Sequence, residues 1–171
     1  AAFGRDSLYS NTNGSNNTAS GYQSLFSNTT GTSNTASGYQ SLYSNTTGFY
    51  NTASGYQSLS SNIIGEFNTA TGLTSLASNT TGNNNTASGA WSLYYNTTGL
   101  ENVAVGYSAL NKNSIGNNSV AIGAWSLYNS TGANNTALGH SSLYSNTTGT
   151  GNMALGKALY ANTTGANNTG I

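Results

Sequence analysis

The chain has 171 residues, of which 28 are Asn, 26 Ser and 25 Thr, and it contains neither Pro nor Cys. Its three basic and three acidic residues cancel, so there is no basic excess of the kind that binds nucleic acid or anionic lipid. The lack of Cys excludes disulfides and thiolate metal sites, and one His with three scattered acids cannot build a metal cage or a paired-carboxylate site. The composition therefore predicts no cofactor, no nucleic-acid partner and, since no apolar run approaches ~18 residues, no membrane insertion.

A seventeen-residue repeat organises the whole chain. The segment Asn17–Leu25 returns unchanged at Asn34–Leu42 and again at Asn51–Leu59. Repeats start near residues 1, 17, 34, 51, 68, 85, 102, 119, 135 and 152, and those starting at 119 and 152 are one residue shorter than the others. Residues 168–171 begin a further repeat. We therefore expect a single repeat array over residues 1–171, forming a segment of a longer fibre.

Five positions of the repeat, counted from its opening residue, keep one residue type in all ten copies. Position three is Ala, positions five and fifteen are Gly, position nine is Leu and position twelve is Asn. The Gly columns include Gly21 and Gly38 at position five, and Gly31 and Gly48 at position fifteen. The Leu column includes Leu25, Leu42, Leu59, Leu76, Leu93, Leu110, Leu127 and Leu143. The Asn column is predicted to consist of Asn11, Asn28, Asn45, Asn62, Asn79, Asn96, Asn113, Asn129, Asn146 and Asn162. Disordered sequence has no reason to keep five columns fixed.

Two glycines per repeat divide each unit into two short arms joined by corners. The arms are rich in Ser, Thr and Tyr and are expected to form strands of four to five residues. Each unit is then one coil of an all-β solenoid, or β-roll, whose coils stack at ~4.8 Å to give a rod of ~48 Å. Identical side chains form ladders along the rod, and the Asn column forms an amide ladder.

One Leu and one Ala per coil make a thin core, so the remaining apolar burial is expected to come from other chains. The residues beside the Ala column change along the chain: Ser20 and Ser37 in early repeats give way to Val105, Ile122 and Leu138 in later ones. Alternate strand residues point to opposite faces. Both faces of the strand are therefore expected to be packed, with the later coils driest inside.

Runs such as Asn118–Gly123 and Thr136–Gly139 resemble the head repeats of trimeric autotransporter adhesins, and the fuller unit Asn135–Gly149 is similar to repeats of phage and environmental tail-fibre-like proteins. The resemblance extends over essentially the whole chain. It implies a trimeric β-roll at a bacterial surface that contacts host matrix or other cells. The adhesin unit is shorter than the unit of this chain, so each coil here has an insertion, and the first half has Ser where the family has Val or Ile.

Aromatic residues recur at positions six and ten, and Tyr43, Tyr94, Tyr128 and Tyr144 are the candidates for binding sugar rings or a partner surface. The alternative is that the rings stack along the rod and stiffen it. Trp91 and Trp125 occupy the Gln position two coils apart, and the same two interpretations apply to them.

Asn-x-Ser/Thr sequons allow N-glycosylation in the Asn column. These acceptor sites are Asn28, Asn45, Asn79, Asn96, Asn129, Asn146 and Asn162. Asn persists, however, where the acceptor hydroxyl is lost, as at Asn62, which indicates that the amide itself is required. Thr columns at positions two, thirteen and fourteen are reminiscent of ice-binding solenoids, although Val103, Ile63 and others interrupt them. His140 lies in a variable position and is expected to be a surface residue.

The sequence thus favours a non-enzymatic structural segment of an extracellular fibre or of a cell or virion surface, most simply a parallel homotrimer. No nucleophile–base pair or general acid is available for catalysis. The alternative is an adhesin head or phage tail-fibre region that binds glycans or cell surfaces. A glycan-coated fibril and an ice-binding solenoid are minor alternatives.

Overall fold

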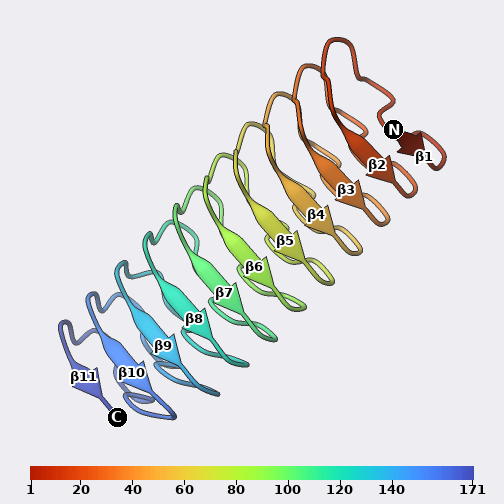
Figure 1. Cartoon of the computed structure of the whole chain (residues 1–171). Coiled ribbons are helices and arrows are strands. Elements are labelled where there is room, and N and C mark those ends of the chain that lie inside the picture. Colours follow the sequence, from red (N-terminus) through yellow and green to blue (C-terminus); the bar gives the residue numbers. More distant parts are fainter.

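The computed structural model describes all of residues 1–171 and is an all-β solenoid of about ten coils. Each coil contributes one short strand to a single parallel sheet along the rod, and the two termini lie at opposite ends (Figure 1). The strands are β1 (Ala2–Phe3), β2 (Thr18–Ser20), β3 (Thr35–Ser37), β4 (Thr52–Ser54), β5 (Thr69–Thr71), β6 (Thr86–Ser88), β7 (Val103–Val105), β8 (Val120–Ile122), β9 (Thr136–Leu138), β10 (Met153–Leu155) and β11 (Thr169–Gly170). The predicted solenoid is confirmed.

The repeat length sets the register of the sheet. Each strand pairs only with its neighbours in sequence, and Ala19 lies opposite Ala36, which lies opposite Ala53 in the next coil. The two shorter repeats keep this register, since Ala121 still pairs with Ala137 and Met153 with Thr169. The deletions are therefore absorbed away from the strand.

The second arm of each coil differs from the prediction, because it is not a strand. The structure has one strand of two or three residues per coil instead of two strands of four to five. In the second arm alternate residues take left-handed backbone angles, with φ of 53° at Gln23 and 51° at Leu25. Such a chain is not extended, yet it still bonds to the next coil, since Leu25 N donates to Ser41 O at 3.0 Å. Of 110 backbone hydrogen bonds only 19 lie within the sheet, so bonds outside the strands hold most of the stack together.

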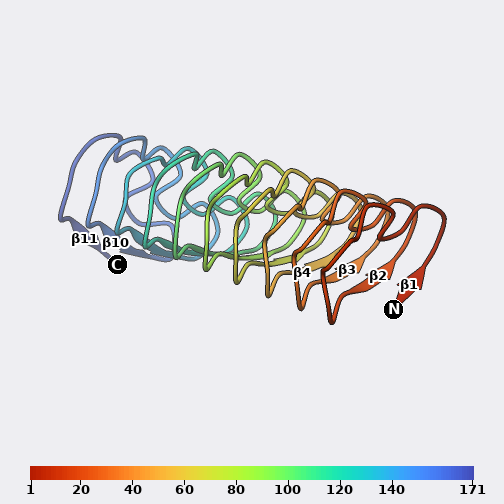
Figure 2. The same ribbon diagram turned by 90° about the horizontal axis from the view of Figure 1, so that it is seen from above.

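The core lies between the strand and the second arm of every coil. Ala at position three and Leu at position nine form one cluster along the rod, and the ladder from Leu25 to Leu143 has no exposed surface. Figure 2 shows the closed outline of the coils that surrounds this core. A left-handed angle at a residue with a Cβ costs ~1–2 kcal/mol. Complete burial of each Leu side chain offsets this cost.

The residues beside the Ala column lie outside the solenoid, which corrects the expectation of drier late coils. In β2 the Ala is buried and the flanking Thr18 and Ser20 are exposed, and in β8 Ile122 is likewise exposed. Alternation along an extended strand sends the neighbours of an inward residue outward. The change from Ser and Thr to Val, Ile and Leu therefore alters the outer face of the sheet and not the core.

Candidate functional surfaces

The Asn column forms the predicted amide ladder. Asn45 has no exposed surface, and its Nδ2 donates to Asn28 Oδ1 at 2.8 Å and to Gly48 O at 3.0 Å. One amide thus joins two coils and closes the corner of its own coil. The same pair of bonds recurs at Asn28, Asn62, Asn79 and Asn96.

Asn129 does not belong to this ladder, which corrects the predicted column. The buried residue at that place is Ser130, whose Oγ accepts a hydrogen bond from Asn146 Nδ2 at 3.1 Å. Asn129 lies one residue earlier, is partly exposed and donates to Tyr144 O at 3.0 Å. This shorter repeat lacks the residue of position fourteen, between Thr131 and Gly132. Counting back from the Gly corner with the usual spacing therefore assigns position twelve to Asn129, one residue too early.

A second amide ladder, at position one, was not predicted from the sequence. Asn34 is fully buried, and its Nδ2 donates to Gly48 O at 2.8 Å while its Oδ1 accepts from Asn51 N at 3.0 Å. The signal was present, because Asn opens every complete repeat except the one at Ser119. Gly48 O therefore accepts hydrogen bonds from the amides of both ladders.

The burial of the Asn column argues against glycans on it. Asn28, Asn45, Asn79, Asn96 and Asn146 have no exposed surface, whereas Asn129 and Asn162 are partly exposed. At Asn28 both Nδ2 hydrogens are used, one by Asn11 Oδ1 and one by Gly31 O. A glycan bonded to any of the five buried Nδ2 atoms is incompatible with this packing.

The two Gly columns are required for different reasons. Gly21 and Gly38 have φ of 136° and 133°, which an L side chain rarely adopts. Gly31 and Gly48 have no such angle, but a Cβ on Gly31 would lie 2.5 Å from Gly48 O and would overlap the Asn28 amide oxygen. Position fifteen therefore needs Gly because the two amide ladders and the next coil approach its backbone closely.

The four candidate Tyr residues are half-buried members of aromatic stacks. Tyr43 stacks on Phe26 at 5.2 Å, and Tyr144 stacks on Tyr128 at 5.4 Å, with nearly parallel rings in both pairs. Tyr94 stacks on Trp91 at 5.7 Å. These contacts are those expected of rings that stiffen the rod.

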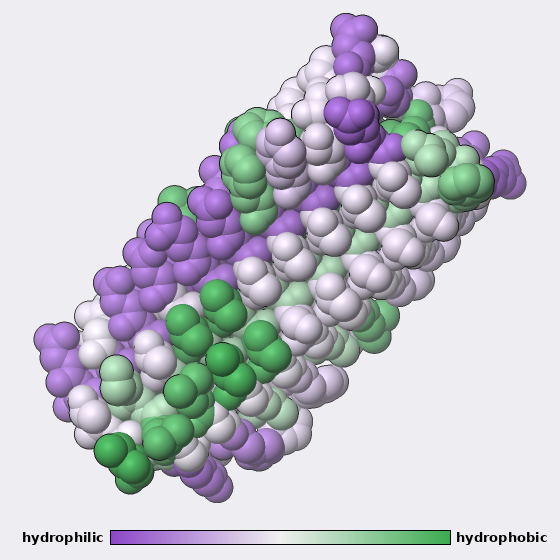
Figure 3. All heavy atoms as spheres, viewed as in Figure 1, coloured by the Kyte–Doolittle hydropathy of each residue, from purple (hydrophilic) through white to green (hydrophobic).

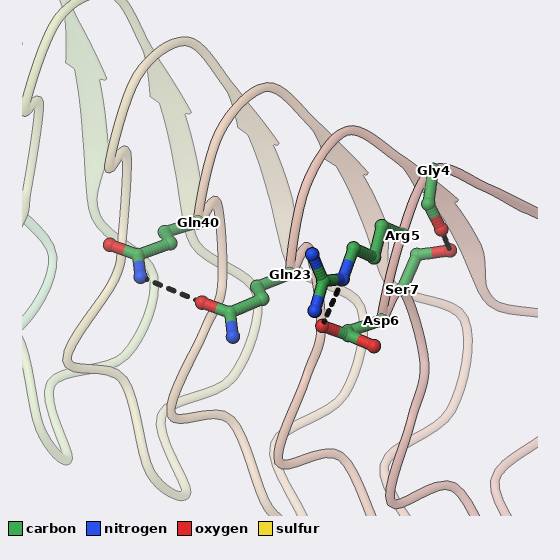
Figure 4. A network of polar contacts seen from close by, with 6 residues as sticks. All are labelled: Gly4, Arg5, Asp6, Ser7, Gln23 and Gln40. Carbon is green, nitrogen blue, oxygen red and sulfur yellow. Dashed lines mark hydrogen bonds and ion pairs between the residues drawn. The ribbon is translucent and has the colours of Figure 1, made fainter.

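Gln residues at position seven form a further, shorter ladder (Figure 4). Gln40 Nε2 donates to Gln23 Oε1 at 2.9 Å, and Gln57 Nε2 donates to Gln40 Oε1 at the same distance. Asp6 occupies this position in the first repeat, where its carboxylate contacts Arg5 at 3.5 Å. The ladder ends after Gln57, because the next occupants are Thr74 and Trp91.

The outer face of the sheet has two chemical halves (Figure 3). Over β2–β6 it carries Ser and Thr hydroxyls, and over β7–β10 it carries exposed or half-buried apolar side chains. We call the second half the apolar face; its residues are Val103, Val105, Val120, Ile122, Leu138, Met153 and Leu155. Of these, Met153 is 55% exposed and Ile122 43%. Such a contiguous patch is typical of an interaction surface.

The Thr columns at positions thirteen and two have different roles: the first bonds neighbouring coils together, and the second lies on the surface of the sheet. Thr29 Oγ1 at position thirteen donates to Thr46 O at 3.1 Å, and Thr46 Oγ1 donates to Ile63 O at 3.0 Å. These hydroxyls bond to the next coil, so position thirteen does not offer a free Thr row to ice. Thr18, Thr35, Thr52 and Thr69 at position two are exposed on the sheet.

The acidic residues and the single His, which are Asp6, Glu66, Glu101 and His140, lie in different coils. No group of three His, Cys, Asp or Glu residues could hold a metal ion, and no helix could span a membrane. His140 Nδ1 lies 3.1 Å from Ser141 Oγ, and its ring lies 5.4 Å from that of Trp125.

No protein-family model, curated protein or solved structure matches the chain.

Proposed function

We propose that the chain is a non-enzymatic structural segment of an extracellular fibre, acting as a rigid repetitive shaft at a cell or virion surface. The observation that supports this is the continuity of the ladders. Backbone register and the Leu column pass from coil to coil, including across the shorter repeat that begins at Ser119. In that repeat Ser119 and Ser130 replace the two buried amides and accept hydrogen bonds from the following coil. A structure in which each coil repeats its neighbour is suited to setting length and stiffness.

In this proposal the shaft is a parallel homotrimer whose copies meet along the outer face of the sheet. The apolar face supports self-association, since it leaves seven apolar side chains of four neighbouring strands unpaired by the chain itself. Identical copies in axial register place apolar rows against apolar rows and hydroxyl rows against hydroxyl rows. An axial shift of several coils would set Ile122 or Leu138 against Thr and Ser, which favours the in-register arrangement.

Sedimentation equilibrium tests the self-association. We expect a mass of three times 17.4 kDa at micromolar concentration. The variant Val105→Ser/Ile122→Ser/Leu138→Ser should be monomeric and folded, because Ser20, Ser37 and Ser54 occupy the same position in earlier coils. A monomeric wild-type chain at every concentration would refute the trimer.

The shaft itself is tested by single-molecule stretching of the chain between two handles. We expect high resistance followed by stepwise loss of coils, each step releasing one repeat. Extension at low force without steps would refute a load-bearing role, whatever the oligomeric state.

A second candidate function is favoured by the exposed aromatic rings. In this alternative the chain belongs to an adhesin head or tail fibre and contacts glycans on a cell surface. Trp91, Tyr107 and Trp125 are 44%, 51% and 40% exposed, which is more than the stacked Tyr43 or Tyr144.

A further inference from the structure

The only two Trp residues of the chain lie in one row. Trp91 and Trp125 both occupy position seven, two coils apart, and both are exposed. Their neighbours in that column are Thr74, Ser108 and Ser141, which carry no ring. Stacking within the column, as in Tyr22–Tyr39–Tyr56 with centroids 5.4 and 5.0 Å apart, therefore does not occur for them. Trp91 stacks instead on Tyr94 of its own coil, which covers one face of its ring.

Two further rings complete the row. Tyr107, from the coil between the two Trp residues, lies 5.9 Å from Trp125 at an interplanar angle of 84°. His140, from the coil after Trp125, lies 5.4 Å from it at 75°. We call Trp91, Tyr107, Trp125 and His140 the tryptophan row: it places one ring on each of four successive coils, with an indole on every second coil.

The row replaces a stabilising feature with exposed rings. Earlier coils carry the Gln ladder at this position, in which Gln40 bonds to Gln23 and to Gln57. Trp91 and Trp125 give up those amide bonds and leave much of each indole in contact with water. Exposed aromatic groups at regular spacing are typical of a binding surface.

The spacing and chemistry of the row fit a polysaccharide. One coil advances the rod by ~4.8 Å, which is close to the length that one pyranose unit adds to an extended β-1,4-linked chain. Alternate sugars of such a chain present the same face, so a disaccharide matches the spacing of the two indoles, ~9.6 Å. The C–H groups on the face of a β-pyranose carry partial positive charge, and the face of an aromatic ring carries negative charge.

The electrostatics of the row favour an uncharged polymer. None of its four members carries a carboxylate or an ammonium group, and the chain as a whole has no net charge. Two cations lie near the row, and each is placed over a Tyr ring outside it. Lys112 Nζ lies 5.3 Å from the Tyr128 centroid, and Lys157, one coil after His140, has its Nζ 4.8 Å from the Tyr160 centroid. An acidic polysaccharide would find no basic residue in the row.

We propose that the tryptophan row binds extended, neutral β-1,4-linked polysaccharides, the class that includes cellulose and chitin. The indole of Trp125 and the free face of Trp91 stack on every second sugar. Tyr107, whose ring is at 84° to that of Trp125, contacts the unit between them through its edge and its hydroxyl. His140 supplies a hydrogen-bonding nitrogen at one end of the row. The row follows the Gly corner after the strand and shares no residue with the apolar face, so this binding does not depend on self-association.

The test compares the wild-type chain with the double variant Trp91→Gln/Trp125→Gln. Gln is the residue that the chain itself carries at this position in three earlier coils, so the variant is expected to fold. Retention is measured on insoluble cellulose and on chitin, with starch as the α-linked control. We expect retention of the wild type on at least one β-1,4-linked polymer and weakening by about tenfold or more in the double variant. The matched control Tyr43→Ser, with the residue found at Ser60, should bind as the wild type does.

Fluorescence gives a second readout, because both Trp residues of the chain lie in the row. Soluble cello- or chito-oligosaccharides of six units should shift the emission of the wild type. Three outcomes would each overturn the proposal: no retention of the wild type on either polymer, equal retention of the double variant, or equal binding to starch. Loss of binding in Tyr43→Ser would also contradict it, because it would place the contact on the stacked column instead.

Discussion

The amide ladder predicts a large cost for losing a single buried Asn. Asn79 has no exposed surface, and its Nδ2 donates to Asn62 Oδ1 at 2.8 Å and to Gly82 O at 3.0 Å. Its own Oδ1 accepts from Asn96 Nδ2 at 2.8 Å. The substitution Asn79→Ala therefore removes three hydrogen bonds, one of them within the coil and two between coils.

The magnitude follows from what each partner retains. Gly82 O keeps the bond from Asn68 Nδ2, and Asn96 Nδ2 keeps the bond to Gly99 O. Asn62 Oδ1 loses its donor, one Nδ2 hydrogen of Asn96 loses its acceptor, and both groups stay buried. Three bonds at ~1 kcal/mol each and two unsatisfied groups at ~1 kcal/mol each give a loss of about 5 kcal/mol in the free energy of unfolding.

The chain supplies a matched variant for comparison. Ser130 occupies the same place in a later coil, donates to Gly132 O at 3.4 Å and accepts from Asn146. Asn79→Ser should therefore cost only about half as much as Asn79→Ala. The control substitution Thr81→Ala, at an exposed residue of the same corner, should change the free energy of unfolding by less than ~0.5 kcal/mol.

Urea unfolding followed by circular dichroism measures the three variants, and hydrogen exchange locates the effect. We expect faster exchange in the coils that contain Asn62, Asn79 and Asn96, and unchanged exchange in distant coils, because each coil contacts only its neighbours. If Asn79→Ala were no more destabilising than Asn79→Ser or Thr81→Ala, the buried ladder would not be a source of stability and the reasoning would fail.

Five further substitutions test the corners, the core and a left-handed position by the same unfolding assay. Gly82→Ala should destabilise the chain severely, because its Cβ would overlap Asn79 Oδ1 and Gly99 O. In the control Gly156→Ala the Cβ meets no atom within 4 Å, so this variant should cost only ~1 kcal/mol for its φ of 70°. Equal costs would contradict the argument that the backbone at Gly82 is closely approached. Leu93→Ala, at a fully buried site, should cost about 3 kcal/mol, while Leu73→Ala, at a 45% exposed site where later coils carry Ala90 and Ala124, should cost far less. Glu101→Asn should raise the free energy of unfolding by about 1 kcal/mol, because Glu101 has a left-handed φ of 57°, which Asn tolerates better than Glu. Asn84 and Asn118 occupy the same column and adopt the same left-handed angle. A loss of stability would show that the Glu side chain has a role of its own.

The sequence by itself determined the repeat, the solenoid and most of the buried columns. A nearly constant repeat length with invariant Ala, Leu and two Gly can be satisfied at every coil only by stacking equivalent residues. The Leu column and nine of the ten residues of the Asn column were predicted for this reason. Ser130 was assigned wrongly because the sequence alone allows the one-residue deletion on either side of it, and only one of the two alignments places Ser130, and not Asn129, in the ladder.

The tertiary structure alone decided how each coil closes. Local preference does not predict left-handed angles at Leu25 or Gln23, because their cost is outweighed only when Leu is buried against the coils above and below. The same closure turned the residues beside Ala outward, made position one a second amide ladder and gave Gly31 its crowded backbone. These features depend on contacts between residues 14 to 17 positions apart, and such contacts exist only once the coils have stacked.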